Sequence, residues 1–360
     1  MMKLLRLLLF PFSILYAIGV IARNLAYDLG IFQSRQFDLP VISIGNLSVG
    51  GSGKSPMTEY LIRLLKDKYK LATLSRGYGR KTSGFRLVDL NSMSSESGDE
   101  PLQFKRKFRD ITVAVCENRV EGINRLISDH ELILLDDAFQ HRALKPGLSL
   151  LLFDYRTLFE PQWFLPTGDL REPMWSAHRA DVIIISKCPQ NLQTDQEQLI
   201  RSRFQNKQVF FSYLSYGNLK SVDGQIPDRD LHSINKKTKI IALSGIANAA
   251  PLLNELASYG PDLIHHEYPD HHQFSEKNIT KLVNTFHGLS GDDKLIITTE
   301  KDAQRLNTEV FREKLKGINV YFLPVEVRFK EPERTEFNNL IEGYASKIGG
   351  NYRIHQEKDR

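Results

Sequence analysis

Residues 41–57 read VISIGNLSVGGSGKSPM, an apolar run followed by a glycine-rich turn and a lysine. The apolar run at 41–44 is typical of a short buried strand, and a helical pattern follows over 57–65. A glycine-rich turn between a strand and a helix lets backbone N–H groups approach phosphate oxygens, and the helix N-terminus adds its positive dipole end. The segment therefore predicts a phosphate-binding loop for a nucleoside triphosphate.

This turn approximates the pattern G-x-x-x-x-G-K-[ST], with Ser48 at the position of the first glycine. Lys54 is expected to reach the β- and γ-phosphates, and the Ser55 hydroxyl is expected to ligate Mg²⁺. The alternative, a flexible glycine-rich turn without a ligand, fits the flanking strand and helix less well. The residues predicted to bind ATP are Gly50, Gly51, Ser52, Gly53, Lys54, Ser55 and Pro56.

Two carboxylates, Asp136 and Asp137, follow another apolar run at 132–135. Carboxyl ends of parallel strands are where open α/β sheets bind ligands. One aspartate is expected to hold Mg²⁺ directly or through water, and the other to orient substrate or a basic group. The alternative is a pair of strand-end carboxylates that cap the next turn. We therefore predict a magnesium site made by Ser55, Asp136 and Asp137.

Apolar runs alternate with helical patterns along most of the chain, which is typical of parallel sheets covered by helices. We expect an α/β fold: a P-loop NTPase-type parallel sheet domain, a second, smaller α/β domain and an N-terminal apolar helix. A serine-rich loop without regular structure is expected at 93–97. Further strands are expected at 71–74, 111–115, 150–153, 182–185, 240–243, 295–297 and 321–323, and helices at 119–127, 195–204, 249–258 and 277–286.

The length of 360 residues exceeds what one hydrophobic core usually supports, so more than one domain is expected. A polar, turn-rich stretch marks the boundary, and the chain is expected to cross back near 324–331. The expected division is a membrane-associating helical segment at 1–36, the P-loop domain at 37–215, a linker at 216–237, the smaller α/β domain at 238–330, and a C-terminal helix and tail at 331–360.

The number of cysteines and the net charge exclude several classes of protein. The two cysteines, Cys116 and Cys188, provide neither a disulfide framework nor a zinc finger, which fits a reducing cytoplasm. A net charge of +5 is a mild excess for this length, and no RNA- or DNA-binding module is visible, so no nucleic-acid partner is expected.

The N-terminal residues 7–22 read LLLFPFSILYAIGVIA, without a charge, and lie between Arg6 and Arg23. As a helix they extend roughly 24 Å, less than the hydrocarbon core of about 30 Å, and Pro11 falls early in the run. The segment favours an interfacial helix with its apolar side in the acyl boundary and with Lys3, Arg6 and Arg23 near anionic headgroups. A spanning helix and a helix packed on its own domain are the alternatives.

The chain contains seven motifs in this order: 45–56, SRGYGR at 75–80, GDEP at 98–101, DDAFQH at 136–141, LPTGDLREP at 165–173, PDHH at 269–272 and TEKD at 299–302. Together they closely resemble the motifs of the tetraacyldisaccharide 4′-kinases of lipid A synthesis. The resemblance extends from the apolar N-terminus to residue 302. It implies that Mg·ATP phosphorylates the 4′-hydroxyl of a lipid-linked glucosamine disaccharide 1-phosphate at the cytoplasmic face of the inner membrane. The chain departs from the family pattern at Ala138 and Asp169.

A sugar hydroxyl is a poor nucleophile, so phosphoryl transfer to it requires a carboxylate placed to take its proton. Asp99, expected in a loop at 98–101, is the candidate, and the resemblance points to the same residue. His271 is expected to pair with Asp99 as a carboxylate–imidazole dyad. From the residues alone, Asp99 fits a turn residue equally well, and His271 fits a surface histidine better.

Arginine forks suit oxyanions, so Arg171 in LREP and Arg119 are candidates for holding transferring or substrate phosphates. The histidines at 265, 266, 271 and 272 are clustered but lack the helical i, i+4 spacing of zinc ligands, and no metal site is predicted there. TEKD at 299–302 is expected to cap a helix and to face the surface between the domains.

A competing hypothesis is a membrane-associated P-loop GTPase or ATPase that acts as a switch. Guanine recognition would need [NT]-K-x-D after a strand, whereas residues 186–189 read SKCP, which keeps the lysine and lacks the aspartate. The sequence therefore favours the kinase, with a lipid-linked disaccharide 1-phosphate and an anionic membrane surface as partners.

Overall fold

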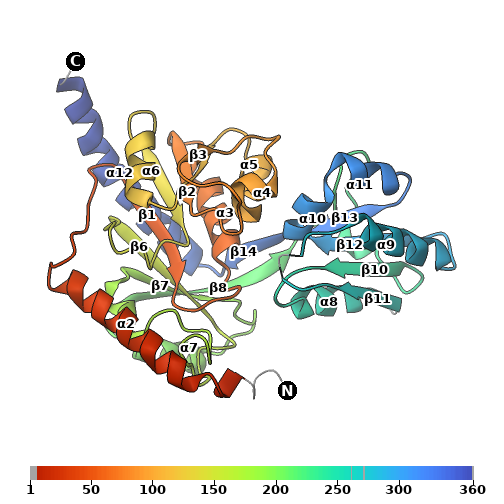
Figure 1. Cartoon of the computed structure of the whole chain (residues 1–360), viewed down its shortest axis with the longest axis horizontal. Helices are drawn as coiled ribbons and strands as arrows, with labels where there is room; N and C mark the ends of the chain where they lie inside the picture. The colour runs from red at the N-terminus through yellow and green to blue at the C-terminus, as the bar shows by residue number, and fades with distance from the viewer. Residues whose placement is uncertain (1–5, 261, 271, 359–360) are drawn as a thin grey trace.

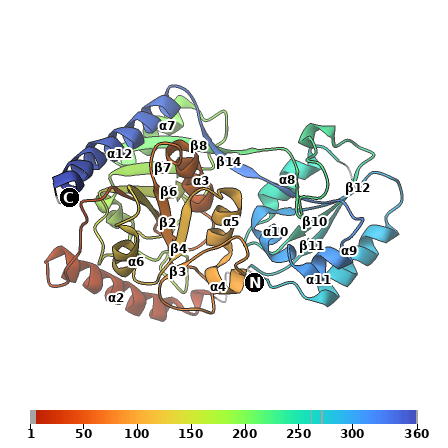
Figure 2. The same cartoon turned by 90° about the horizontal axis from the view of Figure 1, so that it is seen from above.

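The computed structural model describes residues 6–260, 262–270 and 272–358, and within them the strands form two sheets that lie side by side (Figures 1 and 2). The larger sheet has the strand order β14 (Val325–Phe329), β8 (Gln208–Tyr216), β7 (Val182–Ser186), β6 (Leu148–Asp154), β1 (Val41–Asn46), β5 (Leu132–Asp136), β2 (Leu71–Ser75), β4 (Thr112–Val115) and β3 (Arg86–Leu87). The smaller sheet has the order β11 (Asp262–Glu267), β10 (Lys239–Ser244), β12 (Lys294–Thr299), β13 (Val320–Leu323) and β9 (Lys220–Ser221). The predicted α/β fold class is confirmed.

Helices cover both faces of both sheets because strand residues alternate between two cores. In β7, Val182 and Ile184 join the core under α3 and α12, whereas Ile183 and Ile185 face the core under α7. The helices are α2 (Phe10–Asp28), α3 (Lys54–Leu65), α4 (Ser94–Ser97), α5 (Asp99–Lys107), α6 (Arg119–Leu126), α7 (Thr194–Arg203), α8 (Ala250–Ala257), α9 (Glu276–Gly288), α10 (Glu300–Leu306), α11 (Glu309–Lys314) and α12 (Glu333–Lys358), with 3₁₀ turns at Met174–Arg179 and Leu231–Ser233.

The division of the chain differs from expectation at two places. The expected linker at 216–237 contains β9, which pairs with β13 in the smaller sheet. The expected smaller domain at 238–330 includes β14, which instead pairs antiparallel with β8 in the larger sheet. The cause is burial, because Val327 and Phe329 of β14 pack into the larger core. The chain thus crosses back within the stretch near 324–331 that the sequence indicated.

Two short segments were also predicted wrongly. The serine-rich stretch expected as a loop at 93–97 contains the one-turn helix α4. Asp99, expected in a loop, is the first residue of α5, in which Leu102 and Phe104 are buried. Gly98 precedes α5 with a φ of 90°, a conformation that suits glycine, and this turn separates α4 from α5.

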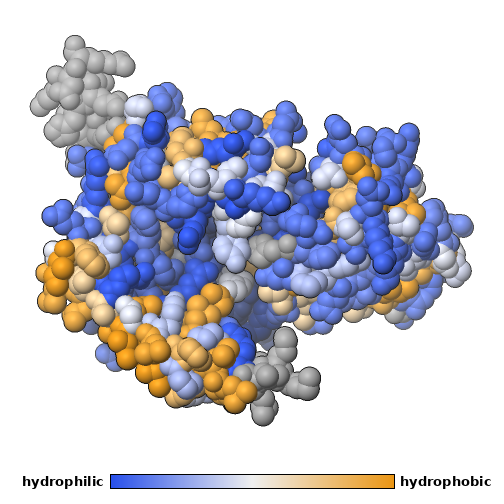
Figure 3. Space-filling model, viewed as in Figure 1, coloured by the Kyte–Doolittle hydropathy of each residue, from blue (hydrophilic) through white to orange (hydrophobic). Residues whose placement is uncertain are grey.

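The N-terminal helix α2 lies along the outside of the larger sheet's domain, at the lower left of Figure 1. It is the one helix within the described ranges that is long and apolar enough to cross a membrane by length and composition. Its buried residues are polar, Ser13 and Asn24, while its apolar side chains point outward. Figure 3 shows them as an orange band along the helix.

Candidate active site

The glycine-rich turn predicted to be the phosphate-binding loop connects β1 to α3, so its place between a strand and a helix is confirmed. Gly50 and Gly53 have φ values of 102° and 87°, and Gly53 is the residue that precedes α3. These conformations suit glycine and turn the loop so that α3 begins at Lys54. Ser48, at the position of the motif's first glycine, forms an isolated bridge with Leu170. The loop is therefore fixed on one side by the segment that contains Arg171.

Lys54 lies at the base of this loop with its side chain only 10% exposed. Its Nζ donates to Asn46 Oδ1 at 3.0 Å and lies 3.6 Å from Asp137 Oδ1. A second lysine, Lys187 at the end of β7, also reaches the loop, where its Nζ contacts the Gly51 carbonyl oxygen and lies 2.6 Å from Asp154 Oδ2. This second contact was not predicted from the sequence, although Lys187 is part of the SKCP motif.

Asp136 and Asp137 lie at the carboxyl end of β5, directly beside β1 in the sheet. Asp136 is 1% exposed and accepts a hydrogen bond from the Thr58 hydroxyl at 3.1 Å. Burial, followed by the carboxylates of Glu100 and Asp137, raises the pKa of Asp136 to about 7. Three acidic groups therefore meet at the phosphate-binding loop.

Asp137 has a φ of 49° and turns toward the arginines. Arg171 Nη1 lies 3.0 Å from both of its carboxylate oxygens. Burial acts to raise the pKa of Asp137, but Lys54 and Arg171 lower it below its usual range. Arg119, at 4% exposed, donates through Nη2 to the Asp137 carbonyl oxygen at 3.2 Å. Arg119 is thus a buried support of this turn.

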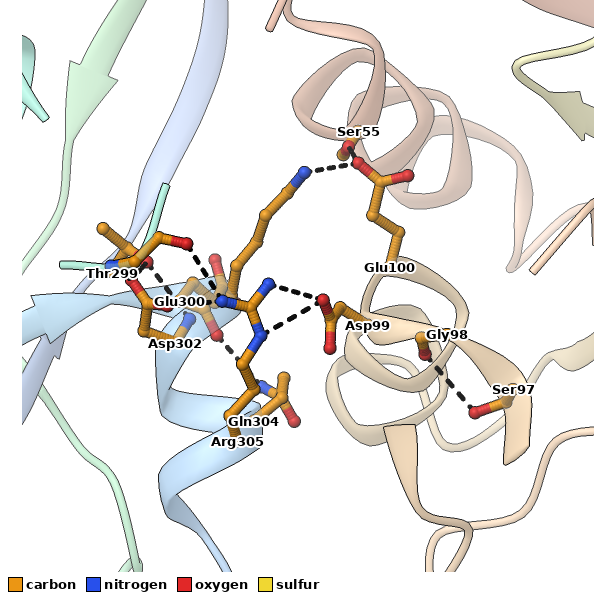
Figure 4. A network of polar contacts seen from close by, with 12 residues as sticks. Ser55, Ser97, Gly98, Asp99, Glu100, Thr299, Glu300, Asp302, Gln304 and Arg305 are labelled. Carbon is orange, nitrogen blue, oxygen red and sulfur yellow. Dashed lines mark hydrogen bonds and ion pairs between the residues drawn. The ribbon is translucent and has the colours of Figure 1, made fainter. Parts of the chain in front are cut away.

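Glu100 links the phosphate-binding loop to the smaller sheet. Its Oε1 accepts a hydrogen bond from Ser55 Oγ at 2.6 Å and lies 2.5 Å from Lys301 Nζ of α10 (Figure 4). Burial acts to raise the pKa of Glu100, yet the Lys301 ammonium lowers it well below its usual range. Ser55 therefore donates a hydrogen bond to an ionised carboxylate beside the loop.

Asp99 makes the second link to α10. Its Oδ2 accepts hydrogen bonds from Arg305 Nη2 at 2.5 Å and from Arg305 Nε at 3.2 Å (Figure 4). The same guanidinium donates through Nη1 to Asp302 Oδ1 and to the Gly245 carbonyl oxygen. His271, the expected partner of Asp99, lies outside the described residues.

The structure thus brings Lys54, Ser55, Asp136, Asp137 and Arg171 to one edge of the larger sheet, with Asp99 on the adjacent α5. Sequence reasoning missed Glu100, Lys301 and Arg305 as members of the site. Glu100 and Lys301 lie inside motifs that we quoted without giving them chemistry, whereas no local pattern marks Arg305. Among the described residues, no group of three or more His, Cys, Asp or Glu side chains is arranged to hold a metal ion alone.

The chain is similar to known proteins over almost its whole length. The family described as tetraacyldisaccharide-1-P 4′-kinase, LpxK, matches residues 5–344. A tetraacyldisaccharide 4′-kinase of Parabacteroides distasonis is 45% identical over 93% of this chain and 93% of that protein. A tetraacyldisaccharide 4′-kinase of Bacteroides thetaiotaomicron is 43% identical over 94% of this chain and 92% of that protein.

The fold is similar to that of a solved structure, the "apo" form of LpxK from Aquifex aeolicus in complex with ATP. The TM-score is 0.73 and the sequence identity 30%, with 94% of this chain and 99% of that chain covered. The chain therefore belongs to the tetraacyldisaccharide-1-P 4′-kinase family and is an ATP-dependent kinase that phosphorylates a tetraacyldisaccharide 1-phosphate at its 4′ position in lipid A biosynthesis.

Proposed function

We propose that this kinase transfers the γ-phosphoryl group of Mg·ATP, held by the phosphate-binding loop, to a 4′-hydroxyl placed beside Asp99. The observation that carries the proposal is the hydrogen bond from Ser55 to Glu100, because it brings the loop within one residue of Asp99. In the transfer, the 4′-oxygen bonds to the γ-phosphorus, the bond from that phosphorus to the bridging oxygen of ADP breaks, and the hydroxyl proton passes to a base.

The loop supplies most of the phosphate binding. The backbone N–H groups of 50–55 and the N-terminus of α3 point partial positive charge at the phosphates. Lys54 adds a full charge beside the position of the β- and γ-phosphates. Arg171 Nη1 lies 3.0 Å from Asp137, at the edge of the sheet where the phosphates would bind. Its guanidinium is therefore placed to stabilise the negative charge that develops on the transferring phosphoryl group.

The oxygens at this edge fit Mg²⁺, a hard cation that binds carboxylates, hydroxyls and substrate phosphates. Burial, together with the carboxylates of Glu100 and Asp137, raises the pKa of Asp136, and a bound cation would favour its charged form. Ser55 and Asp136 would hold the ion, with Asp137 and Glu100 nearby, and ATP would supply the remaining ligands. When bound, Mg²⁺ neutralises charge on the β- and γ-phosphates.

Asp99 is the proposed base, in a dyad with His271. Its hydrogen bonds from Arg305 fix the carboxylate at the start of α5, facing the smaller sheet. A fixed carboxylate can accept the hydroxyl proton without first reorganising, which is the benefit of preorganised catalytic groups.

We further propose that α2 attaches the enzyme to the membrane surface without crossing the bilayer. Ser13 Oγ donates to Thr167 Oγ1 at 2.8 Å, and Tyr16 Oη donates to the Arg171 carbonyl oxygen at 3.1 Å. At its C-terminal half, Arg23 and Asn24 both bind the fully buried Glu172. A helix tied to the folded body along its length would have to break these contacts to span a membrane.

The expected electrostatic part of this attachment is not supported for two of its three cations. Arg6 and Arg23 form ion pairs with Asp169 and Glu172. Lys3 lies outside the described residues. The attachment therefore rests on apolar side chains of the outer face, which include Phe12, Leu15 and Ile18.

Incubation of the protein with γ-labelled ATP, Mg²⁺ and a tetraacyldisaccharide 1-phosphate in mixed micelles tests the proposed chemistry. Label is expected in the lipid for the wild type and in at most a trace for Asp99→Ala. Transfer by Asp99→Ala at the wild-type rate would contradict the role of Asp99. Loss of the reaction when a chelator removes Mg²⁺ is expected as well.

A further inference from the structure

The contact between α5 and α10 is made of polar and charged pairs. The pairs form two groups, one at the first residues of α5 and one at its last residues. At the start of α5 the partners are Asp99 with Arg305 and Glu100 with Lys301, and at its end they are Arg106 with Gln304 and Lys107 with Glu300. The pair nearest the phosphate-binding loop is Glu100 with Lys301.

Lys301 occupies a position that a metal cation would also favour. Its Nζ lies 2.5 Å from Glu100 Oε1, the same oxygen that accepts the Ser55 hydroxyl at 2.6 Å. Burial acts to lower the pKa of Lys301, yet the net shift is upward because carboxylates surround the ammonium. Glu100 contributes most to this field, followed by Asp136 and Asp99.

We propose that Lys301 is a positioning residue that competes with Mg²⁺ for the oxygens around Ser55 and Glu100, so that binding of Mg·ATP displaces Lys301 and releases this end of α10 from α5. This inference rests on the proposed magnesium site at Ser55 and Asp136. No metal ligand comes from Lys301 itself. Its role is to balance the acidic groups of the larger domain with a charge from the smaller one.

The physical reason is charge balance at one small site. The Lys301 ammonium offsets the negative charge of Glu100 and Asp136, as Mg²⁺ would. A divalent ion held by Ser55 and Asp136 repels an ammonium bound to Glu100 a few ångströms away, since like charges in a partly buried site are poorly screened. Binding of Mg²⁺ therefore weakens the contact of Lys301 with this site, and Lys301 weakens the binding of Mg²⁺.

The first test measures Mg²⁺ dependence by binding rather than by turnover. Binding of a fluorescent ATP analogue is followed while Mg²⁺ is titrated into the full-length wild type and into Lys301→Met, which keeps the length of the side chain and removes its charge. We expect the Mg²⁺ concentration at half-maximal binding to fall about fivefold in Lys301→Met, a size typical of one partly exposed ion pair.

Arg106→Gln is the matched control, because it disrupts another contact between the same helices away from Ser55. The control is expected to keep the wild-type Mg²⁺ requirement. An unchanged or higher Mg²⁺ requirement in Lys301→Met would overturn the competition. If ATP binding by the wild type does not depend on Mg²⁺, both this inference and the proposed magnesium site fail. If wild-type binding depends on Mg²⁺ and Lys301→Met shows the same dependence, the inference alone fails.

A second measurement needs no substitution and so holds even if Lys301→Met fails to fold. Amide hydrogen exchange across 300–306 is compared in the wild type with ATP and a chelator and with Mg·ATP. Displacement of Lys301 predicts faster exchange at the start of α10 with Mg·ATP. Equal or slower exchange there would contradict the proposal.

Discussion

Asp99 and Glu100 are neighbours in sequence and contact different parts of the site. Glu100 contacts Ser55 of the phosphate-binding loop and Lys301 of α10, whereas Asp99 receives the guanidinium of Arg305. The first turn of α5 therefore connects the nucleotide side of the site with the smaller sheet. A change at either residue should alter a different step, which mutation can separate.

Asp99→Ala is expected to lower kcat about 10²- to 10⁴-fold, the usual contribution of a general base, with little change in ATP affinity. Steady-state kinetics and nucleotide binding measure the two effects. Asp129→Ala, at an exposed site on the same domain, serves as the control. Weaker ATP binding with an unchanged kcat would instead make Asp99 a nucleotide contact.

Lys54→Ala is expected to abolish phosphoryl transfer while the protein stays folded. Lys54 acts on phosphate charge, and its contact with Asn46 is a single hydrogen bond at the sheet edge. Label transfer and thermal unfolding are measured together, with the exposed Lys68→Ala as control. Turnover near the wild-type rate would contradict the assignment of the loop.

Asp136→Asn is expected to stabilise the protein at neutral pH in the presence of a chelator. The pKa of Asp136 is raised to about 7, so between about pH 4 and pH 7 the folded protein holds a proton that the unfolded chain has released. Wild-type stability therefore falls as pH rises through this window. Asparagine does not titrate and keeps the oxygen that accepts from Thr58, so the variant should gain about 4 kcal/mol above pH 7 and little near pH 4.

Urea unfolding at a series of pH values measures this difference. A constant difference across the window would show that the substitution acts through packing rather than through ionisation.

The helix α2 was predicted correctly as an apolar N-terminal helix with an outward apolar side, but the contacts that hold it on the protein body were not predicted. Its buried residues are Ser13 and Asn24, which face the body. Their partners Thr167 and Glu172 lie about 150 positions away, so the pattern inside the helix does not contain this information. Periodicity shows that one face of a helix is more apolar than the other, but it does not show which face packs on the rest of the protein.

Leu15→Glu combined with Ile18→Glu is expected to reduce sedimentation with anionic vesicles severalfold and to leave thermal unfolding unchanged. The two side chains are 67% and 59% exposed, so charge there costs little in the folded protein and much in an acyl environment. Val310→Glu, at an exposed apolar residue of α11, is the control. Undiminished vesicle binding by the double variant would place the membrane contact elsewhere.

The two sheets are joined by charge pairs as well as by the strands β8 and β14. Figure 2 shows α5 and α10 meeting between them. The larger sheet, its phosphate-binding loop and the strand-end aspartates could be predicted because neighbouring residues determine each of them. The pairs Glu100 with Lys301 and Asp99 with Arg305 could not, because they join residues 201 and 206 positions apart.

Arg305→Leu is expected to destabilise the protein by about 3–5 kcal/mol, because it takes a buried cation away from Asp99 and Asp302. Urea unfolding measures the loss. Arg312→Leu, at an exposed arginine of α11, should change stability by less than about 0.5 kcal/mol. A small loss for Arg305→Leu would show that water or other groups readily replace the guanidinium.

The segment 163–172 contacts both α2 and the phosphate-binding loop. Thr167 and Glu172 bind α2, while the Asp169 carbonyl oxygen accepts the Val49 N–H at 2.7 Å. One short stretch thus holds the phosphate-binding loop at a fixed distance from α2. On the proposed membrane attachment, that distance also determines the depth in the headgroup layer from which a hydroxyl can be phosphorylated. Insertion of residues between Thr167 and Glu172 would then change which sugar position comes within reach, even with every catalytic side chain intact.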